Sequence, residues 1–176
     1  MDGYLLDTNH VVPLLRNNDD HRAAILQRLG TVAAESPVYI ATATIAELEV
    51  GCCLRTSGRV EGQAEIREVI HANGVKVLDF TIHTAAEYGG LKAALMRKYN
   101  RKDFVQAAKR PEAWVHADTG DKLGFDEMDL IIISHAVERN LVLVTSDPMK
   151  RINDGIRSTE IAVRSENWVA APGPSR

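Results

Sequence analysis

The strongest indication of the fold is near the start of the chain, in Gly3-Tyr4-Leu5-Leu6-Asp7-Thr8-Asn9. In this stretch a short apolar run is followed directly by an acidic residue. A short run of this kind predicts a strand buried on both faces, as in a parallel sheet. The residues from about Asn9 to Arg16 predict a helix directly after it. Asp7 therefore stands at the carboxyl end of the strand, the edge at which parallel α/β sheets bind their ligands.

The alternation of strand and helix continues along the chain. Further strands are predicted at Val38–Ala41, Val75–Phe80 and Leu141–Thr145, with a short edge strand at Ile161–Val163. Helices are predicted at Asp20–Gly30, Thr44–Leu54, Val60–His71, Thr81–Leu95 and Asp126–Arg139. Strands separated by helices imply a parallel sheet with helices on both faces, so the predicted class is α/β.

The composition is that of one globular domain. Of the 176 residues, 45% are hydrophobic and 26% are charged, which excludes a disordered chain. The net charge of −3 excludes a basic nucleic-acid coat protein. We place the domain at residues 1–169, with an insertion or functional loop at 97–124 and a disordered tail at 170–176.

The chain carries the features of a soluble, cytoplasmic protein with no membrane partner. Cys52 and Cys53 are adjacent, so a disulfide framework is excluded and a reducing compartment is expected. The most apolar stretches are too short to cross a membrane. Asp2 and Asp7 argue against a secretory signal.

Five acids follow the predicted strands at the edge where ligands bind. Asp7 follows the first strand, Glu47 lies one turn into the helix after the second, and Asp147 follows the last strong strand. Asp126 and Asp129 stand three residues apart on one face of a helix, so both are candidate metal ligands. If the sheet is parallel, these acids converge on one edge.

Converging carboxylates need a counter-ion. Two of them about 4 Å apart repel by roughly 4 kcal/mol at an effective dielectric of 20, so a cluster takes up protons or binds divalent cations. Oxygen ligands favour Mg²⁺ or Mn²⁺ over zinc. Two such ions about 3.5–4 Å apart activate water and stabilise the leaving oxygen of a phosphodiester. The acids therefore predict metal-assisted phosphoryl hydrolysis.

Structural roles for the same acids remain open at this stage. Asp126 fits the N-cap of its helix, with Asp129 at the third position of a weak capping box. Asp147 precedes a proline and could cap a short helix, and Glu47 could be a solvated helix residue. Asp7, directly after a buried strand, is the hardest to explain structurally.

Four motifs stand in a fixed order along the chain. They are Asp7-Thr8-Asn9 after an apolar strand, Ala46-Glu47-Leu48 with Gly51, Asp129-Leu130-Ile131-Ile132, and Val142-Leu143-Val144-Thr145-Ser146-Asp147. Together, from Tyr4 to Trp168, they resemble the PIN-domain ribonucleases, and most closely the VapC-like toxins of bacterial toxin–antitoxin pairs. The resemblance implies a three-layer fold in which helices flank a parallel central sheet.

The resemblance also implies a Mg²⁺- or Mn²⁺-dependent endoribonuclease that hydrolyses RNA. Its catalytic and metal-binding acids would be Asp7, Glu47, Asp129 and Asp147. Thr8 would orient Asp7 or a metal-bound water, Asn9 would cap the first helix, and the hydroxyls of Thr145 and Ser146 would donate to carboxylate or phosphate. The expected partners are RNA, an antitoxin that covers the acidic site, and a second copy in a homodimer.

The chain departs from the family pattern at two positions. Family members often carry asparagine in place of Ser146 and an apolar residue in place of His10. Two rival functions remain, a housekeeping PIN nuclease in RNA processing and a catalytically silent PIN module that holds RNA or protein. A neighbouring antitoxin gene distinguishes a toxin from the first rival, and a metal-dependent cleavage assay tests the second.

Basic residues gather in the segment from Arg97 to Arg110. Six cations stand there against one acid, Asp103, a local charge of +5 in a molecule whose other residues sum to −8. Tyr99 and Phe104 are interleaved and could stack on unpaired bases. The segment is predicted to guide RNA phosphates, although a solvated helix end is the alternative. The cations are Arg97, Lys98, Arg101, Lys102, Lys109 and Arg110.

Replacing Arg101 and Lys102 with alanine should weaken RNA binding and flatten its salt dependence. Each lost phosphate contact removes about 0.7 from the log–log salt slope of single-stranded binding, so we expect a change of roughly 1–1.5. The slope is measured without metal or with Ca²⁺, which prevents cleavage. Metal binding should be unchanged, and an unaltered slope would reduce the segment to a solvated surface.

Overall fold

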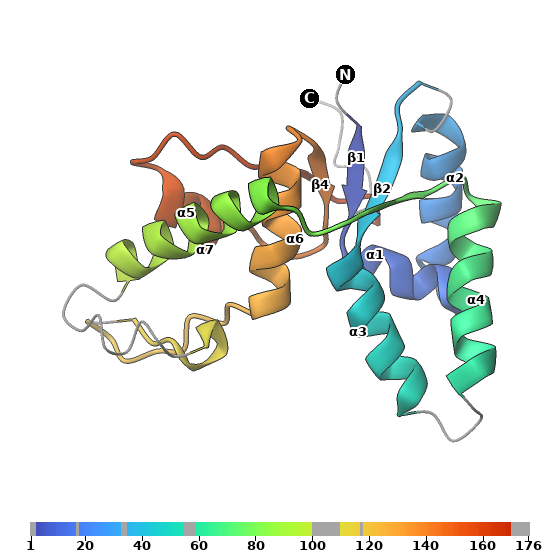
Figure 1. Cartoon of the computed structure of the whole chain (residues 1–176), viewed down its shortest axis with the longest axis horizontal. Coiled ribbons are helices and arrows are strands. Elements are labelled where there is room, and N and C mark those ends of the chain that lie inside the picture. Colours follow the sequence, from blue (N-terminus) through green and yellow to red (C-terminus); the bar gives the residue numbers. More distant parts are fainter. Residues whose placement is uncertain are drawn as a thin grey trace. The chain divides into compact units, whose positions relative to one another are not determined.

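The apolar run after Gly3 forms the central strand of a five-stranded sheet. This strand, β1 (Tyr4–Leu6), is buried along its whole length and pairs with β2 (Val38–Ala41) and β4 (Val142–Val144) (Figure 1). The edges are β3 (Lys76–Leu78) and β5 (Arg164–Glu166), in the order β3-β2-β1-β4-β5. All pairings are parallel, which confirms the predicted α/β class.

The computed structural model describes residues 3–16, 18–32, 35–54, 59–99, 110–116 and 118–169. These residues belong to two compact units. The first comprises residues 1–79, 141–147 and 164–176 and contains the sheet, and the second comprises residues 80–140 and 148–163. Among the described helices, none combines the length and the apolar character that a membrane span requires. The predicted tail at 170–176 lies outside the described residues.

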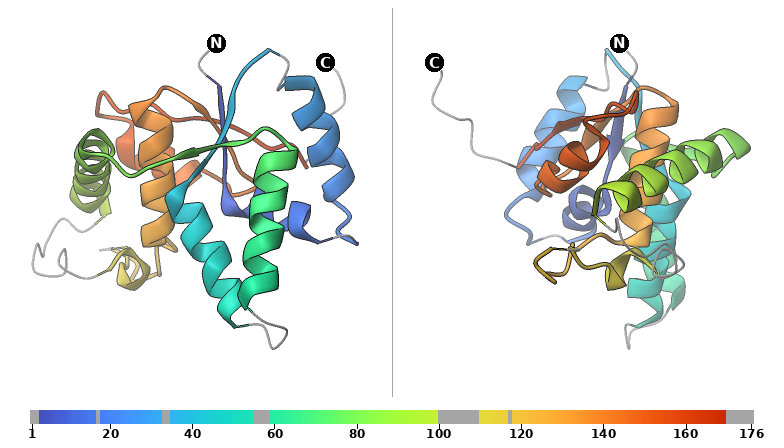
Figure 2. Two further views of the ribbon diagram at one scale, coloured as in Figure 1. Left: turned by 45° about the vertical axis from the view of Figure 1, so that its right-hand side comes forward. Right: turned by 90° about the vertical axis from the view of Figure 1, so that its left-hand side faces the viewer.

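In the described part of the first unit, four helices and one 3₁₀ turn accompany the sheet. They are α1 (Thr8–Val11), η1 (Val12–Leu15), α2 (Arg22–Val32), α3 (Thr42–Cys53) and α4 (Arg59–Ala72). Their apolar faces join the sheet in one core that includes Leu6, Val11, Ile25, Ile40 and Leu48. α3 and α4 lie side by side as a helical hairpin (Figures 1 and 2).

The second unit is helical. It contains α5 (Ile82–Tyr99), the 3₁₀ turn η3 (Pro111–Ala113), α6 (Glu127–Glu138) and α7 (Lys150–Ile156), with α5 packed on α6 and α7. Polar contacts join the opposite ends of α5 and α6. Lys92 Nζ lies 2.8 Å from Glu127 Oε1 at the start of α6, and the Thr84 hydroxyl donates to Glu138 at its end. α5 and α6 therefore run antiparallel.

Several predicted boundaries were wrong for local reasons. The first helix is split, because Pro13 stands at the start of η1 and cannot donate a backbone hydrogen bond. α2 continues past Gly30 to Val32, and α5 extends to Tyr99. The edge strand lies at Arg164–Glu166, not at Ile161–Val163. Its side chains are polar, so no apolar pattern marks it. η3 had no predicted counterpart. α7 matches the short helix that the proline after Asp147 allowed, but its N-cap is Met149 and not Asp147.

The α3–α4 hairpin depends on a close approach at Gly62. A methyl group there would lie 2.5 Å from the Cys52 sulfur and 2.8 Å from the Cys52 Cβ. Gly62→Ala should therefore lower the free energy of unfolding by about 1–3 kcal/mol, measured in urea. The matched control is Gly51→Ala on α3, where the added carbon has no described neighbour within 4 Å. It should be neutral or stabilising by up to about 1 kcal/mol, and equal stabilities of the two variants would contradict the close packing.

Candidate active site

Asp7 lies at the carboxyl end of β1, where the strand order reverses between β1 and β4. Its backbone N–H donates to the Val144 carbonyl at 3.0 Å, which joins the ends of the two strands. The side chain is 6% exposed and caps α1, because Oδ1 accepts a hydrogen bond from the Thr8 backbone N–H at 2.7 Å. The crevice at such a reversal is where open parallel sheets bind ligands.

Residues after β4 complete a hydrogen-bond network around Asp7. The Thr145 hydroxyl donates to Asp7 Oδ2 at 2.7 Å and accepts from the Asp147 backbone N–H at 3.0 Å. The Asn9 amide nitrogen lies 2.9 Å from Asp7 Oδ2 and 3.3 Å from Asp147 Oδ2. One amide therefore bridges the two predicted carboxylates, of which Asp7 is buried and Asp147 is exposed.

Glu47 joins this network through Thr8. It lies on α3, which follows β2, and its side chain is half-buried. The Thr8 hydroxyl donates to Glu47 Oε2, while the Thr8 backbone N–H holds Asp7. The structure thus links three of the four predicted acids through Thr8, Asn9 and Thr145.

The electrostatics of Asp7 suit a metal ligand. Burial raises the pKa of its carboxyl group, and Asp147 adds to the rise, while hydrogen bonds from Thr145, Thr8 and Asn9 oppose it. No cationic side chain of the described residues contributes to this balance. Oxygen donors around an uncompensated buried carboxylate fit Mg²⁺ or Mn²⁺. Within the described ranges no three His, Cys, Asp or Glu side chains form a complete metal cluster.

The other predicted acids lie at the start of α6 in the second unit. Asp126 is the N-cap, and its Oδ1 accepts from the Met128 backbone N–H at 2.7 Å. Glu127 forms the ion pair with Lys92. Burial raises the pKa of Glu127 and lowers that of Lys92. Asp126 and Glu127 therefore have structural roles at this helix start, and Asp129, which is half-buried, lies two residues further along α6.

One expected role of a neighbouring residue differs from what the structure shows. Asp7 is the N-cap of α1, so the expectation that Asn9 caps this helix was wrong. Thr8 holds Asp7 through its backbone N–H and donates its hydroxyl to Glu47, while its alternative role toward a metal-bound water stays a prediction. Thr145 donates to Asp7 as expected, whereas Ser146 contributes its backbone N–H, which donates to Asn9 Oδ1 at 3.2 Å.

Sequence reasoning gave no role to His10, which is fully buried behind Asn9. Its Nδ1 lies 2.7 Å from Asn9 Oδ1, and its Nε2 accepts from the Trp168 backbone N–H at 3.3 Å. The one available signal was a polar side chain at a position that the helix pattern assigns to the core. Burial lowers the pKa of His10 to about 4, opposed by Asn167 and Asp147 and reinforced by His21.

The predicted RNA-binding segment is only partly described. Arg97, Lys98 and Arg110 are exposed. Tyr99 is buried and its hydroxyl donates to the Arg151 carbonyl at 2.8 Å, so the expectation that it stacks on bases was wrong. Arg101, Lys102, Phe104 and Lys109 lie outside the described residues.

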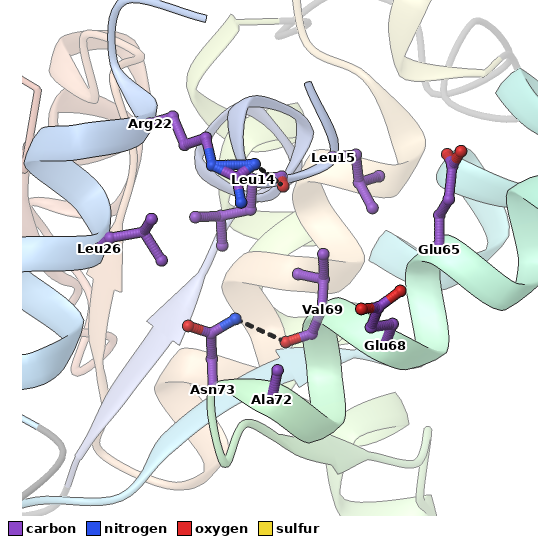
Figure 3. Close-up of a pocket in the computed structure, with 9 residues that line it drawn as sticks. All are labelled: Leu14, Leu15, Arg22, Leu26, Glu65, Glu68, Val69, Ala72 and Asn73. Atoms are coloured by element: carbon purple, nitrogen blue, oxygen red, sulfur yellow. Dashed lines mark hydrogen bonds between the residues drawn. The ribbon is translucent and has the colours of Figure 1, made fainter. Parts of the chain in front are cut away.

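A groove of about 300 Å³ lies between η1, α2 and α4, and Figure 3 shows the residues that line it. Arg22 crosses it to donate to the Leu14 carbonyl at 3.1 Å, and Asn73 donates to the Val69 carbonyl at 2.8 Å (Figure 3). A smaller hollow of about 120 Å³ is lined by Thr8 and Glu47 among others. Of the four predicted acids, Glu47 lines the smaller hollow and none lines the larger groove.

The sheet order and the acids at its carboxyl edge define an α/β protein with a carboxylate site. The PIN domain family model matches residues 4–153, and the chain belongs to this family. No curated protein sequence matches the chain.

Solved structures with the same fold cover nearly the whole chain. VapBC2 from Rickettsia felis, bound to a DNA fragment from its promoter, has a TM-score of 0.67 at 23% identity, over 94% of this chain and 98% of that one. DNA-bound VapBC from Salmonella typhimurium has a TM-score of 0.63 at 23% identity, over 96% and 99%. VapBC-1 from nontypeable Haemophilus influenzae has a TM-score of 0.64 at 21% identity, over 95% and 98%.

Millimolar Mn²⁺ should raise the melting temperature, because a ligand that binds only the folded state stabilises it by about 1.4 kcal/mol at ten times its Kd. The rise should shrink in Asp7→Asn, which keeps acceptor oxygen but loses charge. Glu49→Gln is the matched control, since Glu49 accepts from the Gln63 amide at 2.7 Å and does not join the network. An unchanged melting curve up to tens of millimolar Mn²⁺ would count against the site.

His10 should make stability fall as the pH falls from 6.5 to 4. Its pKa is about 4 when folded and 6.5 ordinarily, so the unfolded chain binds more protons in this window. The resulting loss of unfolding free energy is at most about 3 kcal/mol, because each pKa unit corresponds to about 1.36 kcal/mol. The difference in unfolding free energy between wild type and His10→Leu should shrink by this amount across the window. A difference independent of pH would contradict the buried neutral ring.

Proposed function

We propose that this PIN-domain protein is a metal-dependent endoribonuclease and the toxin of a toxin–antitoxin pair. The observation that carries the proposal is the buried carboxylate of Asp7 at the strand-order reversal, bridged to Asp147 by Asn9 and to Glu47 by Thr8. No cationic side chain of the described residues contributes to the pKa of Asp7, and a desolvated acid is costly to keep charged unless a cation binds beside it.

Asp7, Glu47, Asp129 and Asp147 would hold Mg²⁺ or Mn²⁺. A divalent cation supplies Lewis acidity and lowers the pKa of water for attack on a phosphodiester. The chain itself does the positioning. Thr145 and Asn9 fix Asp7, Thr8 fixes Glu47, and the basic residues at 97–110 would draw in the RNA.

Membership of the PIN family and the likeness to VapBC structures support the toxin assignment. The partners proposed for this chain are an RNA substrate, an antitoxin and a second copy of the chain in a homodimer, and the proposed location is the cytoplasm. A small neighbouring gene whose product binds this protein would distinguish a toxin from a housekeeping nuclease.

Asp129→Asn should abolish Mg²⁺-dependent RNA cleavage and leave the fold intact, because it would remove the charge of one proposed metal ligand while keeping the size of the side chain. The matched control is Asp126→Asn, three residues away on the same helix end. Asn is as good an N-cap as Asp, so this variant should keep both its melting temperature and its cleavage rate.

Cleavage of a labelled RNA with and without Mg²⁺ measures both variants. If the Asp129→Asn variant folds and cleaves RNA at the wild-type rate, Asp129 is not a metal ligand. If Asp126→Asn loses cleavage, Asp126 is to be counted among the ligands. Absence of cleavage in the wild type, with RNA still bound, would favour a silent binding module.

A further inference from the structure

A chain of hydrogen bonds runs from the acids to a residue far away in sequence. The Trp168 backbone N–H donates to His10 Nε2, His10 Nδ1 contacts Asn9 Oδ1, and the Asn9 amide nitrogen contacts Asp7 and Asp147. Every member belongs to the first unit. His10 is the only one of these side chains with no exposure at all among those the structure describes.

The neighbours of Asn9 leave its amide one orientation. Its nitrogen faces carboxylate oxygens of Asp7 and Asp147, which accept, and its oxygen lies 3.2 Å from the Ser146 backbone N–H, which donates. A flipped amide would set oxygen against carboxylate and NH₂ against N–H. The Asn9 oxygen therefore faces His10.

The tautomer of His10 follows from that orientation. Nδ1, 2.7 Å from the Asn9 oxygen, has to carry the proton. In the neutral ring Nε2 is then the acceptor, which matches the Trp168 backbone N–H at 3.3 Å. Trp168 is itself held in place, because its ring packs edge-on against Tyr4 at 5.4 Å and its Nε1 donates to Glu166 at 3.2 Å.

We propose that His10 is a positioning residue of the acidic site, whose Nδ1–H holds the Asn9 amide where it bridges Asp7 and Asp147. The inference rests on the proposed function. With an apolar residue at this position, the Asn9 oxygen would lose the His10 donor and keep the hydrogen bond from the Ser146 backbone N–H. The amide would then be held less firmly between the two carboxylates. Residues that orient metal ligands in this way typically change metal affinity or activity 10–100-fold when they are replaced.

Two substitutions separate positioning from packing. His10→Leu keeps an apolar filling and removes the donor, whereas His10→Asn can place an amide N–H near the former Nδ1. We expect His10→Leu to lose about 10–100-fold in Mn²⁺ affinity or in kcat, and His10→Asn to recover part of the loss. Thr44→Val is the control, because Thr44 is fully buried and its hydroxyl bonds to no described residue. It should behave as wild type.

The tautomer provides a readout that needs neither metal nor RNA. In ¹⁵N-labelled, metal-free protein at neutral pH, the imidazole nitrogen shifts and couplings of His10 should identify the Nδ1–H form. An Nε2–H form would overturn the proposal. A folded His10→Leu with wild-type Mn²⁺ affinity and cleavage would overturn it too, as would equal losses in His10→Leu and His10→Asn.

Failure of the proposed function gives a different pattern. In that case neither Mn²⁺ binding nor cleavage would respond to Asp7→Asn. The positioning inference is overturned instead when Asp7→Asn impairs both while His10→Leu impairs neither. If His10→Leu does not fold, the tautomer in the wild type and the behaviour of His10→Asn still decide the proposal.

Discussion

The candidate site depends on the buried carboxylate of Asp7, to which no cationic side chain of the described residues contributes. Burial raises the pKa of Asp7, and hydrogen-bond donors around it offset part of this rise and so favour the charged form. These donors are the Thr8 backbone N–H, the Thr145 hydroxyl and the Asn9 amide, and each comes from a segment whose course the sheet fixes. The parallel pairing of β1 with β4 is therefore a requirement of the site as well as of the core.

The parts of the fold with strong apolar patterns could be predicted from the sequence. β1, β2 and β4 are apolar runs, and the helix after Asp126 has its cap and its buried face in the expected places. β5 could not be predicted, because Arg164, Ser165 and Glu166 pair through their backbone with a strand whose position only the fold determines.

The candidate acids could be selected from the sequence, whereas the hydrogen bonds made by their neighbours could not. An acid directly after a buried strand has few structural explanations, so Asp7 stood out. The bridging role of Asn9 could not be predicted, because its amide nitrogen contacts Thr145 and Asp147, which lie 136 and 138 residues away, in addition to the nearby Asp7. The ion pair of Lys92 with Glu127 was equally hidden, since 35 residues separate its members. Local sequence patterns do not predict contacts between residues that are so far apart in the chain.

The hydrogen-bond chain that ends at Trp168 also sets the time at which the site can form during synthesis. The hydrogen bond between Asp7 and Thr145 can form only after 138 further residues have been added, and the one between His10 and Trp168 only after 158. A nascent chain folds from its N-terminal end as it emerges, so the first strand and its acid exist long before their partners. A nascent chain released from the ribosome before Trp168 has been added would lack the last hydrogen bond of the network, so the complete network requires synthesis to proceed past this residue.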